Sequence, residues 1–306
     1  MTGPRNRKGA PHEPGLNPAD NDGQADSRKR AQRPQPTGTP PRVICVSSGK
    51  GGVGKTNIVT NLAYALAKQG KKVLLLDADL NLANVDVLLG LTPRFNLHHV
   101  LLGEKSLTEI LIDGPGGFKI LPASSGIMEL ASLTESQKLY FMGEMETVGD
   151  KIDIMLVDTG AGINDNVVYF NLAAQERVIV LTPEPTSLTD AYALIKVLSG
   201  RHDVKRFRIL VNNADSEKEA VAVFRKLSIV ADRFLSTISL DLVGYVLFDR
   251  NLPKAVRKQK LVSELFPDAE SSRMFKTLST QIIAEKPEQH SDGNIKFFWQ
   301  GLLDLS

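Results

Sequence analysis

The 306-residue sequence contains a single cysteine, Cys45, within the apolar run VICV. One thiol cannot form an intrachain disulfide, and it cannot build a thiolate-only metal cluster within one chain. These absences exclude a disulfide scaffold and an iron–sulfur centre held by one subunit. We expect Cys45 to be a small, buried and unreactive core residue.

The sequence also lacks a strong net charge and a long apolar run. Its 37 lysines and arginines nearly balance 35 acidic residues, for a net charge of +2, so the chain is not a polycation that coats nucleic acid. No run approaches the ~20 apolar residues that span a bilayer, and the N-terminus has no apolar core of a secretory signal. We expect a cytoplasmic protein with no specific nucleic-acid partner.

Large apolar side chains are scarce in residues 1–41, which hold eight of the 16 prolines and seven lysines and arginines. Such a segment cannot bury enough surface to offset its ordering entropy, so we predict a disordered, basic, proline-rich arm. An inert tail and a docking peptide for a partner both fit this composition. Residues 286–294 are polar and contain a proline and a glycine, which predicts a linker.

Between these segments the sequence alternates between apolar strands and helices. Predicted strands occupy residues 42–47, 71–77, 118–123, 152–158, 176–182, 207–213 and 242–248. Predicted helices include residues 56–69, 133–149, 187–200 and 218–236. Several strands are apolar at successive positions, as strands buried on both faces require. The pattern predicts an α/β fold with a doubly wound, mostly parallel sheet and helices on both faces.

A glycine-rich segment follows the first predicted strand and opens the first helix. It fits the pattern G-x-x-x-x-G-K-[ST] over Gly49, Lys50, Gly51, Gly52, Val53, Gly54, Lys55 and Thr56, and continues into Asn57. Strand, loop and helix in this order predict a phosphate-binding P-loop, whose backbone N–H groups and helix N-terminus bind the anion. Lys55 is expected on the β- and γ-phosphates, and the Thr56 hydroxyl on Mg²⁺. The alternative is a glycine-rich turn without a ligand.

Acidic residues stand at the ends of two predicted strands. Asp77 and Asp79 follow LLL, and Asp158 follows IMLV ahead of Gly160 and Gly162. Phosphoryl transfer needs carboxylates that hold the metal and order water. An acid in this position can instead cap the following helix. Because ligands of such sheets bind beyond the carboxyl ends of the strands, three acids at that edge favour a metal-assisted site.

Residues 42–285 resemble the deviant Walker A ATPases of the MinD/ParA class, which have a P-loop NTPase fold. Lys50, in the segment GKGGVGKT, matches the signature lysine of that class. The resemblance implies that Lys50 reaches across an ATP-dependent homodimer to the partner's phosphates. It implies a slow, partner-regulated, Mg²⁺-dependent ATPase in which Lys50, Lys55, Asp79 and Asp158 carry the chemistry.

The resemblance also implies roles for residues near the metal and the base. Asp79 resembles the acid that orients the attacking water, and Asp77 and Asp158 resemble acids near Mg²⁺. Asn212 matches the adenine contact, and the loop around Phe248 and Asp249 would flank the base on its other side. The segment NNAD loosely resembles the guanine motif N-K-x-D without its lysine, so ATP is favoured over GTP by the family and not by spacing.

Within the class, the chain most resembles the flagellar-number regulators of the FlhG (FleN) branch. The segments VDTGAGIND, TPEPTSLTDAYALIK and ILPASSGIMELASLTESQ carry this likeness. Pro183 and Pro185 fix a turn at a strand end, and Ser187 or Thr189 is predicted to cap the next helix. The branch implies control of flagellar number or placement. Flagellar switch components, a transcription regulator and a signal-recognition-type GTPase are its implied partners.

Two rival functions and one departure accompany this resemblance. A MinD-type division-site regulator and a ParA-like DNA-partitioning ATPase have the same nucleotide motifs. The near-neutral charge speaks against the DNA-binding rival. The GTPase-activating motif D-Q-A-x-x-L-R of the branch is matched only at Gln24, Ala25 and Arg28, which puts activation of the GTPase in doubt.

The C-terminal residues 295–306 can form an amphipathic helix. At 100° per residue, one face gathers the apolar side chains of Ile295, Phe298, Trp299, Leu302 and Leu303. Twelve residues give ~18 Å of helix, which is too short to span a membrane but can lie in its interface. We predict reversible, peripheral attachment to the cytoplasmic membrane. Docking of the same face on the protein's own core is the alternative.

Overall fold

The computed structural model describes residues 41–79, 84–122, 134–149, 151–235 and 237–285. The chain divides into two units, Met1–Thr37 and Gly38–Ser306, and every described residue belongs to the second. The predicted arm except Pro41, the linker 286–294 and the tail helix 295–306 lie outside the described residues. So do the predicted membrane contacts of that helix.

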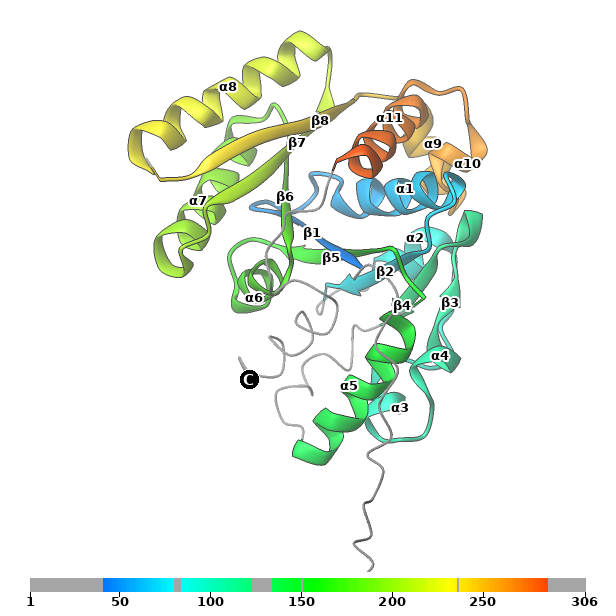
Figure 1. Ribbon diagram of the computed structural model, residues 1–306. Helices are drawn as coiled ribbons and strands as arrows, with labels where there is room; N and C mark the ends of the chain where they lie inside the picture. Colours follow the sequence, from blue (N-terminus) through cyan, green and yellow to red (C-terminus); the bar gives the residue numbers. More distant parts are fainter. Residues whose placement is uncertain (1–40, 80–83, 123–133, 150, 236, 286–306) are drawn as a thin grey trace, which may run out of the picture. The chain divides into compact units, whose positions relative to one another are not determined.

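An eight-stranded sheet forms the centre of the described chain, in the order β3-β4-β2-β5-β1-β6-β7-β8 (Figure 1). Its strands are β1 (Arg42–Ser48), β2 (Val73–Ala78), β3 (Ile112–Asp113), β4 (Lys119–Pro122), β5 (Ile154–Ala161), β6 (Glu176–Leu181), β7 (Arg206–Ala214) and β8 (Ser239–Leu247). All neighbours pair in parallel except β3 and β4. The predicted mostly parallel α/β sheet is therefore confirmed, and only the two-residue β3 was missed.

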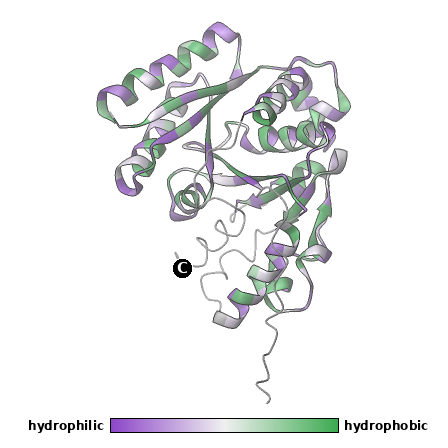
Figure 2. Ribbon diagram, viewed as in Figure 1, coloured by the Kyte–Doolittle hydropathy of each residue, from purple (hydrophilic) through white to green (hydrophobic). Residues whose placement is uncertain are grey.

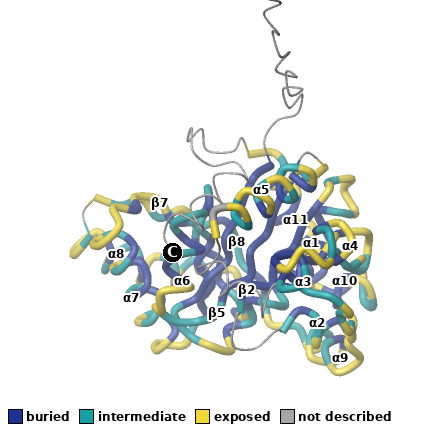
Figure 3. The backbone as a smooth tube through the Cα atoms, turned by 90° about the horizontal axis from the view of Figure 1, so that it is seen from below, coloured by how far each residue is buried: buried dark blue, intermediate teal, exposed yellow. Residues whose placement is uncertain are grey.

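Helices cover both faces of this sheet because side chains alternate between faces along each strand. Ile44 and Val46 of β1 pack in one core with α1 (Lys55–Lys68) and α11 (Glu270–Ala284). Val43 and Cys45 face the opposite core, with α5 (Glu135–Gly149) and α6 (Asp165–Ala173). The central strands β1, β2, β5 and β6 are largely buried between these layers (Figures 1 and 3).

Cys45 is buried as expected. Burial raises the pKa of its thiol to about 12, so the reactive thiolate is scarce at neutral pH. The residue serves packing.

The remaining helices are short connectors except for α7 and α8. They are α2 (Val85–Leu89), α3 (Leu97–Leu101), α4 (Leu107–Ile110), the 3₁₀ turn η1 (Pro115–Gly117), α7 (Pro185–His202), α8 (Glu217–Phe234), α9 (Asn251–Arg257) and α10 (Val262–Leu265). The Ser216 hydroxyl caps α8 by accepting the N–H of Glu219 at 3.2 Å. The buried side of α8 carries Ala220, Val223, Leu227 and Ala231, and its ribbon alternates between apolar and polar stretches (Figure 2).

The predicted cap of α7 is wrong. Glu184 is its N-cap and Pro185 its first residue, so Ser187 and Thr189 lie inside the helix. Proline suits the first helical position because its fixed φ is helical and no N–H is lost there. The Ser187 hydroxyl instead accepts the N–H of Thr182 at 3.0 Å and ties the end of β6 to α7.

A buried Arg–Glu cluster closes the amino edge of the sheet, where the parallel strands begin. Arg42 Nη2 and Arg208 Nη1 each donate to Glu176 Oε2 at 2.7 Å. Arg42 also donates to the carbonyl oxygens of Ile282 and Glu285, the latter at 3.3 Å. The cluster thus fixes the C-terminal end of α11, where the described chain ends, to the starts of β1 and β6.

Replacing Glu176 with glutamine is expected to lower the free energy of unfolding by about 2 kcal/mol, because the buried Arg42 and the half-buried Arg208 lose their buried anionic acceptor and keep only the exposed Glu285 carboxylate. Urea unfolding followed by circular dichroism measures the effect. Asp113→Asn is the matched control: it breaks the exposed Asp113–Lys119 ion pair, which is worth less than about 1 kcal/mol. Equal losses in the two variants would contradict a structural role for the cluster.

Candidate functional site

The glycine-rich loop lies at the carboxyl edge of the sheet, between the central strand β1 and helix α1. Helix α1 begins at Lys55, and its N-cap Gly54 has φ 91° and makes no side-chain cap. A left-handed φ favours glycine, and the uncapped N–H groups of a 14-residue helix form an anion-binding end. Lys55 is buried at this end, so its charge is held beside the loop.

Gly49 is required by packing against α7. A Cβ at this position would lie 2.1 Å from both the carbonyl carbon and the carbonyl oxygen of Asp190. A Cβ atom added at Gly51 would have no other atom within 4 Å. The first glycine therefore lets β1 approach helix α7, and the later glycines shape the loop.

Gly49→Ala is expected to destabilise the nucleotide-free protein by about 1–3 kcal/mol, because the backbone of α7 cannot yield to the new methyl group without displacement. Gly51→Ala, in the same loop, should change the stability by less than about 0.5 kcal/mol. Thermal unfolding without nucleotide compares the two. A Gly49→Ala protein as stable as Gly51→Ala would mean that the contact with α7 is not tight in solution.

The structure brings the predicted acids together beside this loop. Asp77 of β2 and Asp158 of β5 are direct neighbours in register, and Asp158 also pairs with Val46 of β1. Asp79 follows β2, and a Cβ on Gly160 would lie 3.5 Å from Asp79 Oδ1. The segments after β2 and β5 thus meet at the edge from which the P-loop leaves β1. Strand β5 continues to Ala161, three residues beyond the predicted end at Asp158.

Asp158 is a buried carboxylate that lies near Lys55 and Thr56. It is 1% exposed, and within the described part of the chain neither of its carboxylate oxygens has a hydrogen-bond partner. Burial raises its pKa to about 7, although the nearby charge of Lys55 opposes this shift. An orphaned carboxylate beside a P-loop suits a hydrated divalent cation, which would satisfy both oxygens.

The Asp77 carboxylate already binds backbone groups of the chain. It accepts the N–H of Asp79 at 3.2 Å and those of Asn84 and Val85 at 3.1 Å each. Burial nevertheless raises its pKa to about 6. Asp77 therefore fixes the start of α2 and would reach a metal only by sharing these bonds.

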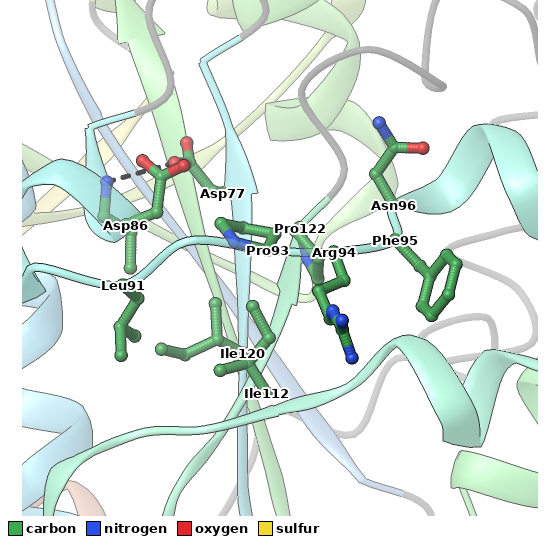
Figure 4. Close-up of a pocket in the computed structure, with 11 residues that line it drawn as sticks. Asp77, Asp86, Leu91, Pro93, Arg94, Phe95, Asn96, Ile112, Ile120 and Pro122 are labelled. Atoms are coloured by element: carbon green, nitrogen blue, oxygen red, sulfur yellow. Dashed lines mark hydrogen bonds between the residues drawn. The ribbon is translucent and has the colours of Figure 1, made fainter.

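A cavity of about 210 Å³ adjoins Asp77 (Figure 4). Asp77 and Asp86 lie at one end of the view, and Arg94 lies across Pro93 and Pro122 from them. Asn96 and apolar side chains that include Leu91, Ile112 and Ile120 line the rest. The cavity lies beside β2 and β4 and borders the acid end of the site.

Lys50 contacts α7 of its own chain. Its Nζ donates to Glu184 Oε2 at 2.6 Å and to the Thr186 hydroxyl at 2.9 Å, and its side chain is 36% exposed. The sequence did not predict this pairing. The available signal was Glu184, which lies between Pro183 and Pro185 at the end of a strand. Two prolines restrict the backbone of such a turn and so limit where the acidic side chain can lie.

The predicted base-contact residues lie at the ends of β7 and β8. Asn212 Nδ2 donates to the carbonyl oxygen of Val53 at 2.7 Å, so it borders the P-loop. Phe248 is half exposed just after β8. Asp249 accepts the N–H of Asn251 at 2.8 Å and both the N–H and hydroxyl of Ser271. Burial tends to raise the pKa of Asp249, but these hydrogen bonds outweigh it and lower that pKa.

Sequence reasoning also missed a buried hydroxyl network beneath the loop. Asn171 Nδ2 donates to the Ser47 hydroxyl at 2.7 Å, and Ser47 and Thr159 share a hydrogen bond of 3.0 Å. The network joins β1, just ahead of the P-loop, to β5, just after Asp158. It couples the two segments that flank the candidate metal position. No helix in the described part of the chain has the length and apolar character needed to cross a membrane.

Comparison with known proteins agrees with this geometry. The model of a protein family described as an AAA domain matches residues 41–209 of this chain. The antiactivator FleN of Pseudomonas aeruginosa is 46% identical over 264 residues, which cover 86% of this chain and 94% of FleN. The flagellum site-determining protein YlxH of Helicobacter pylori is 37% identical over 74% of this chain and 76% of its own. The MinD cell division protein of Aquifex aeolicus has a similar structure, with a TM-score of 0.61, 27% identity, and coverage of 80% of this chain and 98% of MinD.

Proposed function

This chain belongs to the MinD/ParA class of P-loop ATPases, in its FleN branch, and on that premise we propose that it is an ATP-dependent, dimerising switch that regulates flagellar number or placement. One observation carries the proposal. A P-loop with both Lys50 and Lys55 opens helix α1, in a chain 46% identical to an antiactivator named FleN over nearly its whole length. The MinD-type alternative has weaker support, since the MinD of Synechocystis is 33% identical.

Nucleotide binding is assigned to the loop from Gly49 to Asn57. Its N–H groups and Lys55 would hold the phosphates. Thr56 and Asp158 would hold Mg²⁺, with Asp77 nearby, and the metal would neutralise charge on the phosphates. The orphaned oxygens of Asp158 support this assignment. Asn212, Phe248 and Asp249 would surround the adenine base at the ends of β7 and β8.

Hydrolysis is assigned to positioning and electrostatics, with no strong general base. Asp79 would orient the attacking water, as its place beside Gly160 supports. Lys55 would stabilise charge on the phosphates in its own chain, and Lys50 would do so in the partner of a homodimer. In the single chain Lys50 is held by Glu184 and Thr186. Dimerisation would therefore exchange an exposed ion pair for a phosphate contact.

Membrane attachment is assigned to the tail helix 295–306, on the cytoplasmic face of the membrane. Burial of one aromatic or leucine side chain contributes roughly 1.5–3 kcal/mol, and ordering a short helix offsets much of it. A single tail would bind weakly, whereas two tails on one dimer would gain from effective concentration. ATP-dependent dimerisation would thus switch attachment on, and hydrolysis would reverse it.

Deleting residues 295–306 is expected to remove at least ~90% of ATP-dependent sedimentation with anionic liposomes, because the apolar face of the predicted helix is lost. Thermal unfolding and ATP binding should stay unchanged. A matched control exchanges Leu302 and Leu303 for isoleucine, which keeps the apolar area. Liposome binding that survives the deletion would place the membrane contact elsewhere.

The regulatory role is tested by complementation of Pseudomonas aeruginosa cells that lack FleN. Flagella per cell are counted by electron microscopy after expression of this chain, its Lys55→Ala variant or an empty vector. The wild-type chain should change the count relative to the vector, and Lys55→Ala should match the vector. A pull-down with ATP-locked protein then asks whether flagellar switch components, a transcription regulator or a GTPase bind. A wild-type count equal to that of the vector would contradict the flagellar assignment.

A further inference from the structure

A second hollow lies at the amino edge of the sheet, at the opposite ends of the strands from the P-loop. It has a volume of about 330 Å³ and is formed by the loops that precede β2, β4 and β5 together with α4. Four lysines line it, namely Lys71, Lys72, Lys119 and Lys151. Apolar side chains form much of the rest of its lining: Ala67, Val73, Leu111, Val148 and Ile152. We call it the lysine-rimmed hollow.

The charges around this hollow leave an excess of cations. Lys119 pairs with Asp113 at 2.5 Å, and the Asp153 carboxylate accepts the backbone N–H of Lys72 at 2.8 Å. The ammonium groups of Lys71, Lys72 and Lys151 form no salt bridge with described residues. Lys72, Lys119 and Lys151 are exposed. A ligand that suits the hollow therefore combines an anionic group with an apolar body.

We propose that the lysine-rimmed hollow binds the headgroup of an anionic phospholipid at the membrane surface. The lysines match the phosphate, and the apolar lining matches the glycerol and first acyl carbons. Basic residues at an anionic membrane surface each contribute about 1 kcal/mol. The inference rests on the proposed membrane attachment, to which it adds a second contact on the folded domain.

The position of the hollow supports this choice of ligand. The Arg–Glu cluster fixes the end of α11 at the starts of β1 and β6, so the chain that leads to the tail helix leaves from this same edge. Strand β5 lies between β1 and β2, and two strand spacings are about 10 Å. The nine residues 286–294 can span up to ~30 Å, so a membrane that holds the tail can also contact the hollow. The nucleotide site lies at the carboxyl edge, so both sites can be filled together.

The test uses the full-length, nucleotide-free protein and dihexanoyl-phosphatidylglycerol below its micelle concentration, with binding measured by calorimetry. Dihexanoyl-phosphatidylcholine and inorganic phosphate are the comparison ligands. The double variant Lys72→Gln/Lys151→Gln should bind the anionic lipid about 25-fold more weakly, at about fivefold for each lysine. Its matched control, Lys218→Gln/Lys226→Gln, removes two exposed lysines from α8 and should stay within about twofold of wild type.

A filling variant separates a shaped hollow from a diffuse basic surface. Thr108 is an exposed lining residue on α4, and Thr108→Trp should weaken lipid binding at least tenfold without a change in charge. Thermal unfolding confirms that each variant is folded. Equal losses in the Lys218/Lys226 control would show diffuse attraction and overturn the proposal. Phosphate or phosphatidylcholine that binds as tightly as the anionic lipid would overturn it too.

The tail deletion separates this inference from the proposed function. If vesicle binding needs the tail but the Lys72/Lys151 variant binds lipid like wild type, the lipid proposal for the hollow is rejected and the tail assignment remains. If the hollow variants lose lipid while the tail deletion leaves vesicle binding intact, the hollow stands and the tail assignment fails. Lipid could also bind the protein that lacks residues 295–306 but not the full-length chain. The chain's own tail would then be the occupant of the hollow, and the lipid assignment would be overturned.

Discussion

Replacing Lys50 with alanine should lower ATP turnover by roughly 10³-fold or more, the effect expected when a cationic finger supplied in trans is lost. ATP binding should remain within a few-fold of wild type, because Lys55 and the loop amides stay in place. In the single chain Lys50 binds Glu184 and Thr186, so its removal costs only an exposed ion pair and leaves the fold intact. The loss should therefore appear in dimerisation and hydrolysis.

Three measurements on full-length protein separate these effects. A fluorescent ATP analogue reports binding, light scattering reports the dimer, and phosphate release reports turnover. Lys218→Ala, which removes an exposed lysine from α8, should behave like wild type in all three. Lys50→Ala that turns over like this control would contradict any catalytic role for the residue.

Mixed dimers decide whether the lysine acts in cis or in trans. Asp79→Asn should abolish hydrolysis in its own site but still supply Lys50 to a partner. A dimer of one Lys50→Ala chain and one Asp79→Asn chain then has one complete site if Lys50 acts in trans, and none if it acts in cis. Mixing the two inactive variants should restore turnover, up to about half the wild-type rate per dimer for one working site in two. Absence of recovery, with mixed dimers present, would reject the trans assignment.

The seven long strands could be predicted from sequence because local apolar runs determine buried parallel strands. The P-loop could also be predicted, since its glycines, lysine and threonine are contiguous. The meeting of Asp77, Asp79 and Asp158 followed from one topological rule, that the carboxyl ends of parallel strands share an edge. Each of these inferences needed only local sequence or strand direction.

The contacts that tune the site could not be predicted, because they join distant segments. Glu184 meets Lys50 across 134 residues of sequence, and Asn212 meets Val53 across 159. Asp77 was predicted to lie near the metal, but the three backbone N–H groups that it accepts depend on the conformation before α2. The cap of α7 was mispredicted because Pro185 starts the helix before the hydroxyl residues. The lysine-rimmed hollow combines the loops before β2, β4 and β5 with helix α4, and it has no sequence signature.

Asp158→Asn should lower turnover roughly 10²–10³-fold, the loss expected for one electrostatic group of the site, and yet stabilise the nucleotide-free protein near neutral pH. In the absence of metal, neither oxygen of the buried wild-type carboxylate has a hydrogen-bond partner of good geometry among the described residues. Burial raises its pKa to about 7, although Lys55 and the Thr56 hydroxyl oppose this shift. An asparagine amide removes the charge but still leaves polar atoms buried. We expect a net gain of about 1–2 kcal/mol at pH 7.5 in metal-free buffer.

The pH dependence of stability gives the sign of this effect. The folded pKa of Asp158 lies above the ordinary aspartate value of 3.8, so the folded state binds more protons than the unfolded state between pH 4 and 7. The contribution of Asp158 to the free energy of unfolding of the wild type is therefore highest below about pH 4 and falls as the pH rises to about 7. The stability advantage of Asp158→Asn should grow over this range and then level off. Asp77 titrates in the same direction, and its negative charge adds to the raised pKa of Asp158, so the difference between the two proteins includes this coupling.

Urea unfolding at pH 5.0, 6.0, 7.0 and 8.0, with chelator present, measures this difference directly. Asp241→Asn, at an exposed position of β8, is the matched control and should show no pH-dependent gain. Added ATP and Mg²⁺ should stabilise wild type more than Asp158→Asn, because a bound cation would satisfy the carboxylate that burial penalises. Bound Mg²⁺ and ATP would then stabilise the fold because they compensate the buried negative charge of Asp158. An Asp158→Asn protein that is less stable than wild type at pH 8.0 would contradict this account.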